Sequence, residues 1–334
     1  MTRFLNVLIG PLVVSASPAW AQSTNDWFAS LYSPEGVELR TDERIFDLYA
    51  VFNAMGYDDA PVIRRDPVPK RGFNSVRQRV RASAAAVFDD RLRQRIDAFF
   101  DAHPLPQTVY VGYAAHLAAS PTFTPGPGAG RELAGFEGLL ATAQAKLKLA
   151  DLFQQTQDEQ RTMLKKYLLE IDAPLAAARR LLHLKDDDEE RRTVLALNML
   201  EAPGVADSLW VEKEQLVVVG PSDKPNLPAV VREYARLHVA PAVERRSGAY
   251  KFEVPVGVRG APVDYVTETV VRAVALKAAL PVAVQDSAAE ADAKAGYGGV
   301  REMVKLLDEF SKSDRPLDAY LADTWPRVDA ARKR

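Results

Sequence analysis

The sequence predicts an α+β protein whose first half is mostly helical and whose second half is mixed. Apolar residues recur at helical spacing through most of residues 44–182. After residue 192, short β-rich apolar runs are separated by Pro203-Gly204 and closed by Gly220-Pro221. The 334 residues are 47% hydrophobic and 26% charged, as in ordinary globular proteins. Because single hydrophobic cores stop growing near roughly 250–300 residues, we expect two domains.

The first 21 residues have the pattern of an export signal. Arg3 supplies the positive start, residues 4–14 are mostly apolar, and Ala19-Trp20-Ala21 gives the small-x-small cleavage pattern. About eleven residues are too few to cross a hydrocarbon core about 30 Å thick, so we expect a signal peptide rather than an anchor. The chain has no cysteine, which excludes disulfides and thiolate metal sites. We therefore expect a bacterial protein, periplasmic or secreted, with no transmembrane segment in the mature chain.

A helical domain is expected over residues 22–185. The helix predicted over 44–55 has Thr41 as candidate N-cap and Gly56 at its end. The other expected helices cover residues 74–89, 90–102, 110–119, 132–148 and 158–182, the last interrupted near Pro174. The charge block at 185–192 is typical of a solvated connection, and we place the domain boundary there.

A second domain is expected over residues 186–334. Runs at 193–200, 209–211 and 215–219 predict a small sheet, and we interpret 215–219 as its edge strand. A buried helix is predicted over 228–240, ending before Pro241. Further helices are predicted over 264–279, 300–310 and 317–328.

Charge and motifs exclude several classes of partner and chemistry. The 43 Lys and Arg residues against 45 Asp and Glu give a net charge of −2, so we expect no nucleic-acid partner. The Gly126-x-Gly128-x-Gly130 loop contains prolines and follows no strand, which does not predict a phosphate site. None of the four histidines forms an H-x₃-H pair, and the sequence has no Gly-x-Ser-x-Gly elbow.

The order of a strand, a helix with a central glutamate and a later helix with a second glutamate resembles gluzincin metallopeptidases. The first helix contains Arg232-Glu233-Tyr234-Ala235-Arg236, and the later one contains Thr267-Glu268-Thr269. The resemblance places Glu233 at the general-base position of the family's HExxH motif and Glu268 at its third-ligand position. Arg232 and Arg236 stand where that motif has its two zinc-binding histidines.

Shorter segments extend the resemblance over most of the mature chain. Val37-Glu38-Leu39, Met55-Gly56-Tyr57-Asp58 and Gly296-Tyr297, with Arg315 and Tyr320, are similar to a family of uncharacterised bacterial exported proteins with an intact zinc motif. The resemblance implies a zincin-like fold for residues 186–334, with a small sheet, an active-site helix and a glutamate helix.

The two arginines change the chemistry that the resemblance implies. A guanidinium has five donors and no lone pair, so it cannot replace a histidine ligand. At about 4 Å and an effective dielectric near 20, its charge would repel a divalent ion by roughly 8 kcal/mol. We therefore expect no metal and no cofactor. Instead, Arg232 or Arg236 is expected to form a salt-bridge cluster with Glu268 and Glu233, the alternative being that Glu268 pairs only with Arg272.

These observations predict a pseudopeptidase, an exported non-catalytic protein that binds a peptide or protein partner in a zincin-like cleft. Two alternatives remain open at this point. One is a hydrolase with a relocated or non-metal active site around Glu233 and Glu268. The other is a helical, envelope-associated scaffold in which the zincin-like half has no binding role.

Overall fold

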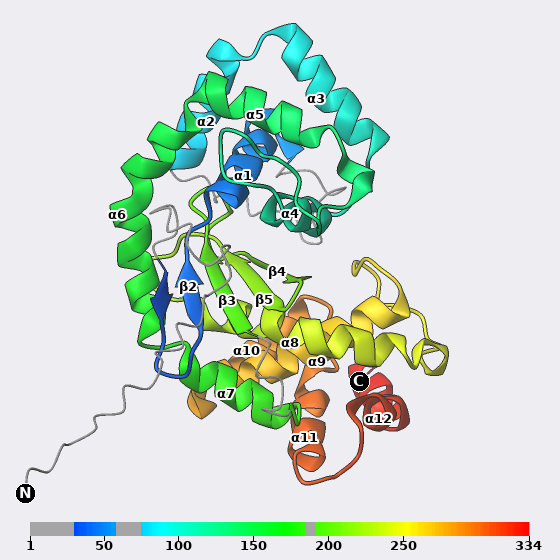
Figure 1. Ribbon diagram of the computed structural model, residues 1–334. Coiled ribbons are helices and arrows are strands. Elements are labelled where there is room, and N and C mark those ends of the chain that lie inside the picture. The colour runs from blue at the N-terminus through cyan, green and yellow to red at the C-terminus, as the bar shows by residue number, and fades with distance from the viewer. Residues whose placement is uncertain (1–29, 58–74, 185–191, 334) are drawn as a thin grey trace, which may run out of the picture.

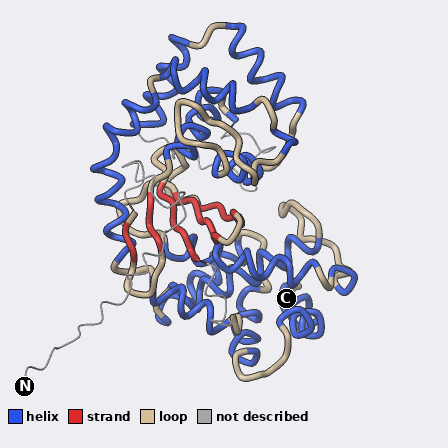
Figure 2. Tube along the Cα trace, viewed as in Figure 1, coloured by secondary structure: helices blue, strands red, loops and turns tan. Residues whose placement is uncertain are grey.

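The computed structural model describes residues 30–57, 75–184 and 192–333. In these ranges twelve α-helices surround one five-stranded mixed sheet, which confirms the α+β class (Figures 1 and 2). The predicted signal peptide lies outside the described residues, as does nearly all of the charge block at 185–192. No helix in the described ranges has both the length and the apolar character needed to cross a membrane.

The sheet joins the two halves of the chain. Its strands are β1 (Leu31–Tyr32), β2 (Glu38–Arg40), β3 (Arg192–Leu197), β4 (Ala206–Val211) and β5 (Glu214–Val219), in the order β1-β2-β3-β5-β4. Strands β2, β3 and β5 are parallel, whereas β1 and β4 run antiparallel to their neighbours at the two ends. Strand β2 was not predicted, because three residues are too few to show a period of two.

The prediction that residues 215–219 form the edge strand is wrong. Strand β5 lies between β3 and β4, and β4 is the strand at that end of the sheet. The register pairs Ala206 with Val219 and Val211 with Glu214, so β4 begins three residues earlier than the predicted run at 209–211. Asp207 and Ser208 interrupt the apolar pattern there, so the first half of the strand has no alternation that would predict it.

One helical layer covers the first face of the sheet (Figure 1). It contains α1 (Glu43–Met55), α2 (Ser75–Val87), α3 (Asp90–Ala102), α4 (Gln107–Ala115) and α5 (Phe136–Leu147). Helix α1 is capped by Asp42, which accepts from the Arg44 backbone, and not by Thr41 as predicted. Gly56 ends α1 as predicted, with a left-handed φ of 76° that favours glycine.

The second helical layer covers the opposite face. It contains α7 (Asp172–Leu181), α8 (Leu227–Glu244), α9 (Pro262–Ala279), α10 (Val282–Lys294), α11 (Val300–Phe310) and α12 (Leu317–Arg332). Helix α6 (Leu149–Leu168) runs along the side of the sheet, with Phe153 in the first core and Leu164 in the second. The predicted helix over 158–182 is therefore two helices, which separate at residues 169–171, and Pro174 lies in the first turn of α7.

The sheet separates two hydrophobic cores, one on each of its faces. On β3, Val194 and Ala196 face the first core, whereas Leu195 and Leu197 face the second. Strand β5 alternates in the same way, as expected for a sheet covered on both faces.

Helix α8 does not end before Pro241, and the prediction that it does is wrong. The helix continues to Glu244 with Pro241 inside it. Proline removes one backbone donor there, but the following residues Ala242 and Val243 are buried, Val243 in the second core, and hold the last turn in place.

Candidate functional site

Helices α8 and α9 pack against each other beneath strand β4 and position the residues singled out by the sequence (Figure 1). Asn226 caps α8 by accepting from the Ala229 backbone, and Pro228 lies in its first turn. Helix α9 also begins with a proline, Pro262, and Asp264 in its first turn accepts from the Ala261 backbone at 2.7 Å. Both helices therefore begin at defined residues, and this sets which side chains of each helix face the other.

Glu233 lies between the sheet and the helices and is only 3% exposed. One carboxylate oxygen, Oε2, accepts from the Ser208 hydroxyl of β4 at 3.0 Å. Arg236 donates to the same carboxylate from Nε at 3.0 and 3.2 Å and from Nη2 at 3.1 Å. Such a bidentate contact to a carboxylate is among the strongest pairings available to arginine.

Arg236 also reaches the second helix. Its Nη2 forms an ion pair with Oε1 of Glu268 on α9, so one guanidinium bridges two carboxylates. Burial opposes the charge of Arg236, but the carboxylates of Glu233 and Glu268 outweigh this effect and raise its pKa above the ordinary value. The arginine therefore remains charged at any working pH.

The series of ion pairs continues beyond Glu268. Its Oε2 lies 3.5 Å from Nε of Arg272, one turn further along α9, and Arg272 Nη1 donates to Asp292 at 2.5 Å. The Arg272 guanidinium also lies over the Tyr297 ring, 4.2 Å from its centroid. Glu268 thus contacts both Arg236 and Arg272, and not Arg272 alone.

Arg232 is placed differently from Arg236. Its Nε lies 3.7 Å from Oε1 of Glu233, beyond hydrogen-bond distance, and no contact with Glu268 is present. The structure therefore brings together Glu233, Arg236 and Glu268, with Arg232 at the edge of the group. Of the other members, Arg272 was recognisable from its i,i+4 spacing to Glu268, whereas nothing in the sequence pointed to Ser208 or Asp292.

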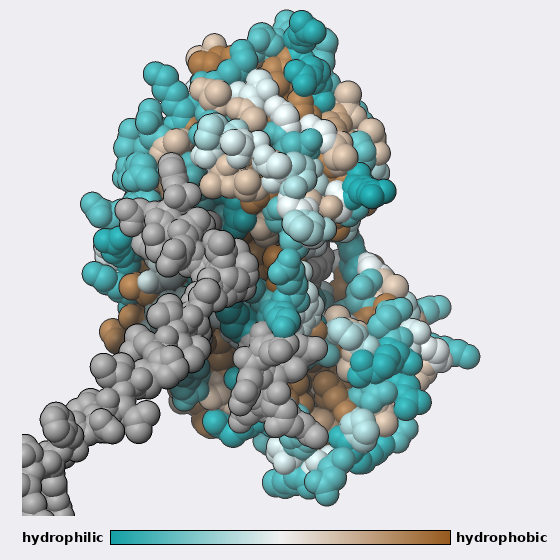
Figure 3. Space-filling view, viewed as in Figure 1, coloured by the Kyte–Doolittle hydropathy of each residue, from teal (hydrophilic) through white to brown (hydrophobic). Residues whose placement is uncertain are grey.

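A pocket of about 410 Å³ lies beside this cluster. Arg236, Ala240 and Glu244 line it along one face of α8, Thr267 and Glu268 line it on α9, and Arg259 lines it from the loop between them. The space-filling view shows an indentation of the molecular surface between the upper helical layer and the lower helices, on the side where β4 ends (Figure 3). The cluster thus forms part of the wall of an accessible pocket.

The residues present do not fit a zinc ion. Two of the positions that the resemblance assigns to ligands carry guanidinium groups, which have donors only. The histidines lie elsewhere: for example, Nδ1 of His116 contacts the Gly112 carbonyl at 2.8 Å, and His238 Nε2 lies 2.8 Å from Gln215. Within the described ranges, no three His, Asp or Glu side chains are grouped so as to hold a metal.

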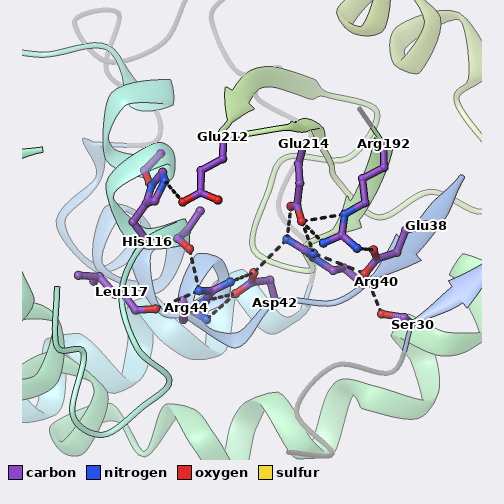
Figure 4. A network of polar contacts seen from close by, with 12 residues as sticks. Ser30, Glu38, Arg40, Asp42, Arg44, His116, Leu117, Arg192, Glu212 and Glu214 are labelled. Carbon is purple, nitrogen blue, oxygen red and sulfur yellow. Dashed lines mark hydrogen bonds and ion pairs between the residues drawn. The ribbon is translucent and has the colours of Figure 1, made fainter. Parts of the chain in front are cut away.

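A second polar network lies on the opposite face of the sheet (Figure 4). Arg40 of β2 donates to Glu214 of β5 at 2.9 Å, and Arg44 of α1 donates to Asp42 at 2.7 Å and to the Leu117 carbonyl at 2.9 Å. Burial alone would raise the pKa of Asp42, but Arg44 and Arg40 lower it below its ordinary value. Because these guanidinium groups are paired, we interpret this network as a link between the first helical layer and the sheet.

Comparisons with protein-family models, with curated proteins and with solved structures each find no match. The resemblance to gluzincins and the roles that it gives to Glu233, Glu268 and the two arginines therefore stay predictions.

Proposed function

We propose that the protein is an exported, non-catalytic pseudopeptidase that binds an extended peptide along strand β4, next to the pocket between α8 and α9. The observation that carries the proposal is the position of Arg236, which bridges Glu233 and Glu268. In the family that the sequence resembles, a metal ion would be held by the residue at the Glu268 position, and the residue at the Glu233 position would act as general base beside it. Here a guanidinium compensates their charge, and neither carboxylate is left to activate water.

Strand β4 supports peptide binding because it is the last strand at its end of the sheet within the described residues. Gly220 donates to the Val205 carbonyl at 2.9 Å, which sets the phase of the antiparallel pairing with β5. Alternate residues of β4 consequently direct their backbone groups away from β5, toward the place where a further strand would pair. Addition of an extended peptide to such an edge is a recurrent mode of recognition.

The contact between β4 and α8 supports a binding role for this region rather than for another edge. The Ser208–Glu233 hydrogen bond fixes the strand over the helix that carries Arg232 and Arg236. The Trp210 ring of β4 meets the His238 ring of α8 edge to face, with centroids 5.9 Å apart. A peptide paired with β4 would therefore have its side chains next to charged and aromatic groups, which can select among sequences.

The test uses the full chain and an array of random decapeptides as the probe. We expect retained peptides to bind without being cleaved, as followed by mass spectrometry, and to lose binding when alternate backbone nitrogens are methylated. Cleavage that disappears in Glu233→Gln would instead establish the hydrolase alternative. Absence of any peptide binding would contradict the proposal and favour the scaffold alternative.

A further inference from the structure

Arg232 is the one arginine of the cluster whose terminal nitrogens are not engaged by the protein in its described part. Arg236 lies between Glu233 and Glu268, and Arg272 lies between Glu268 and Asp292. Arg232 approaches only Glu233, through Nε at 3.7 Å, and this buried Nε has no hydrogen-bond partner. Its guanidinium therefore keeps its hydrogen-bonding capacity for another group.

The neighbouring carboxylate does not need Arg232 for its own compensation. Glu233 already accepts three hydrogen bonds from Arg236 and one from Ser208. A carboxylate brought to the far side of Arg232 would thus meet a cation whose nearest acidic neighbour is neutralised by Arg236.

Arg232 lies on α8, the helix that packs against β4, where the proposed peptide would bind. It lies one turn before Arg236 on the same face of α8, and this face continues along Ala240 and Glu244 into the pocket. The Arg232 side chain is 22% exposed, against 10% for Arg236, so it is accessible while remaining held by the helix.

We propose that Arg232 anchors a carboxylate group of the bound peptide through its terminal nitrogens. This inference rests on the proposed function, because it names the chemistry that the peptide must carry. A planar guanidinium and a planar carboxylate match in two parallel hydrogen bonds, which a lysine cannot reproduce. The carboxylate can come from the peptide C-terminus or from an Asp or Glu side chain, two sources with the same chemistry.

The experiment compares four matched sets of the decapeptide probe with the parent protein and with Arg232→Gln. The sets have a free or an amidated C-terminus, and Asp and Glu either present or replaced by Asn and Gln. We expect the parent to prefer one carboxylate source by about 10- to 100-fold and Arg232→Gln to lose that preference. Arg232→Lys should restore only part of it, and Arg245→Gln, a charge removal at the exposed end of α8, should leave it unchanged.

A second measurement is independent of peptide binding. The ¹⁵N resonance of the Arg232 Nε–H group is followed during titration with acetate and, as a control, with acetamide. We expect acetate alone to shift it. Peptide binding without carboxylate preference, together with no acetate shift, would overturn this inference and leave the proposed function standing. An acetate shift without peptide binding would instead contradict the proposed function while retaining the carboxylate site, and a preference lost on substituting Arg259 would place the anchor elsewhere.

Discussion

Replacing Arg236 by methionine tests whether the guanidinium holds the cluster together. The substitution keeps much of the apolar stem but leaves the Glu233 and Glu268 carboxylates without the cation that bridges them. Breaking one side of a buried ion pair costs about 3–5 kcal/mol. Because Glu233 keeps its bond to Ser208, and Glu268 keeps Arg272 at 3.5 Å, we expect a loss of about 3 kcal/mol in the free energy of unfolding.

A double-mutant cycle separates the pair from its surroundings. Glu268→Gln alone leaves Arg236 bound to Glu233, so we expect a smaller loss of about 1–2 kcal/mol. Once Arg236 is gone, the same change removes a carboxylate that has lost one of its two cations and keeps Arg272 at 3.5 Å. The double variant should therefore be more stable than the sum of the two single effects by about 1–3 kcal/mol.

The assay is urea unfolding at constant pH and temperature, with Arg327→Met as the matched control. Arg327 also bridges two carboxylates, those of Glu302 and Glu309, but on the surface, where its side chain is 50% exposed. Exposed pairs of this kind contribute little, so the control should unfold much like the parent. If Arg236→Met is no more harmful than Arg327→Met, or if the cycle is additive, the bridging role assigned to Arg236 is wrong.

Three other predictions concern Asp47, the two arginines of α8 and Gly128. Burial, together with nearby carboxylates, raises the pKa of Asp47 well above its ordinary value, so the folded state retains a proton that the unfolded state loses as the pH rises above about 4. The unfolding free energy should therefore fall with rising pH, by at most about 1.4 kcal/mol per pH unit for this group, and Asp47→Asn should flatten the curve measured by urea unfolding between pH 5 and 8. Arg232→His combined with Arg236→His should raise zinc affinity in competition with a chromophoric chelator, and no gain would mean that the resemblance misplaces these helices. Gly128→Ala would put a methyl carbon 2.0 Å from Cδ2 of His116 and should lower the melting temperature. Gly138→Ala, whose added carbon would have no such atom within 4 Å, should not lower it.

Helix limits were predictable where local signals were complete. Helices α3 and α11 begin and end at the predicted residues, because apolar spacing and the flanking residues agreed at both ends. Helix α8 was cut short, since Pro241 is a local stop signal that tertiary burial of Val243 overrides. Helix α10 was missed because only Ala289 in it is buried, so it has no clear apolar stripe.

The candidate site was only partly accessible from the sequence. Helical spacing placed Arg232 and Arg236 on one face of α8, but it cannot say which of them meets Glu268. That choice depends on how α8 packs against α9, which is set by contacts distant in sequence. The bond from Ser208 to Glu233 depends in the same way on strand β4, whose first half showed no apolar alternation.

The alternation of β3 and β5 between two cores has a consequence for how the protein comes apart. Leu195 and Val194 are neighbours on one strand, yet each is part of a different hydrophobic core. If either helical layer unfolded, one face of the sheet would be exposed to water. The backbone hydrogen bonds of the sheet, on which the other layer packs, would then be weakened. We therefore expect the two layers to unfold in one cooperative transition. A destabilising substitution in one core should then lower the stability of the helices on the other side of the sheet as well.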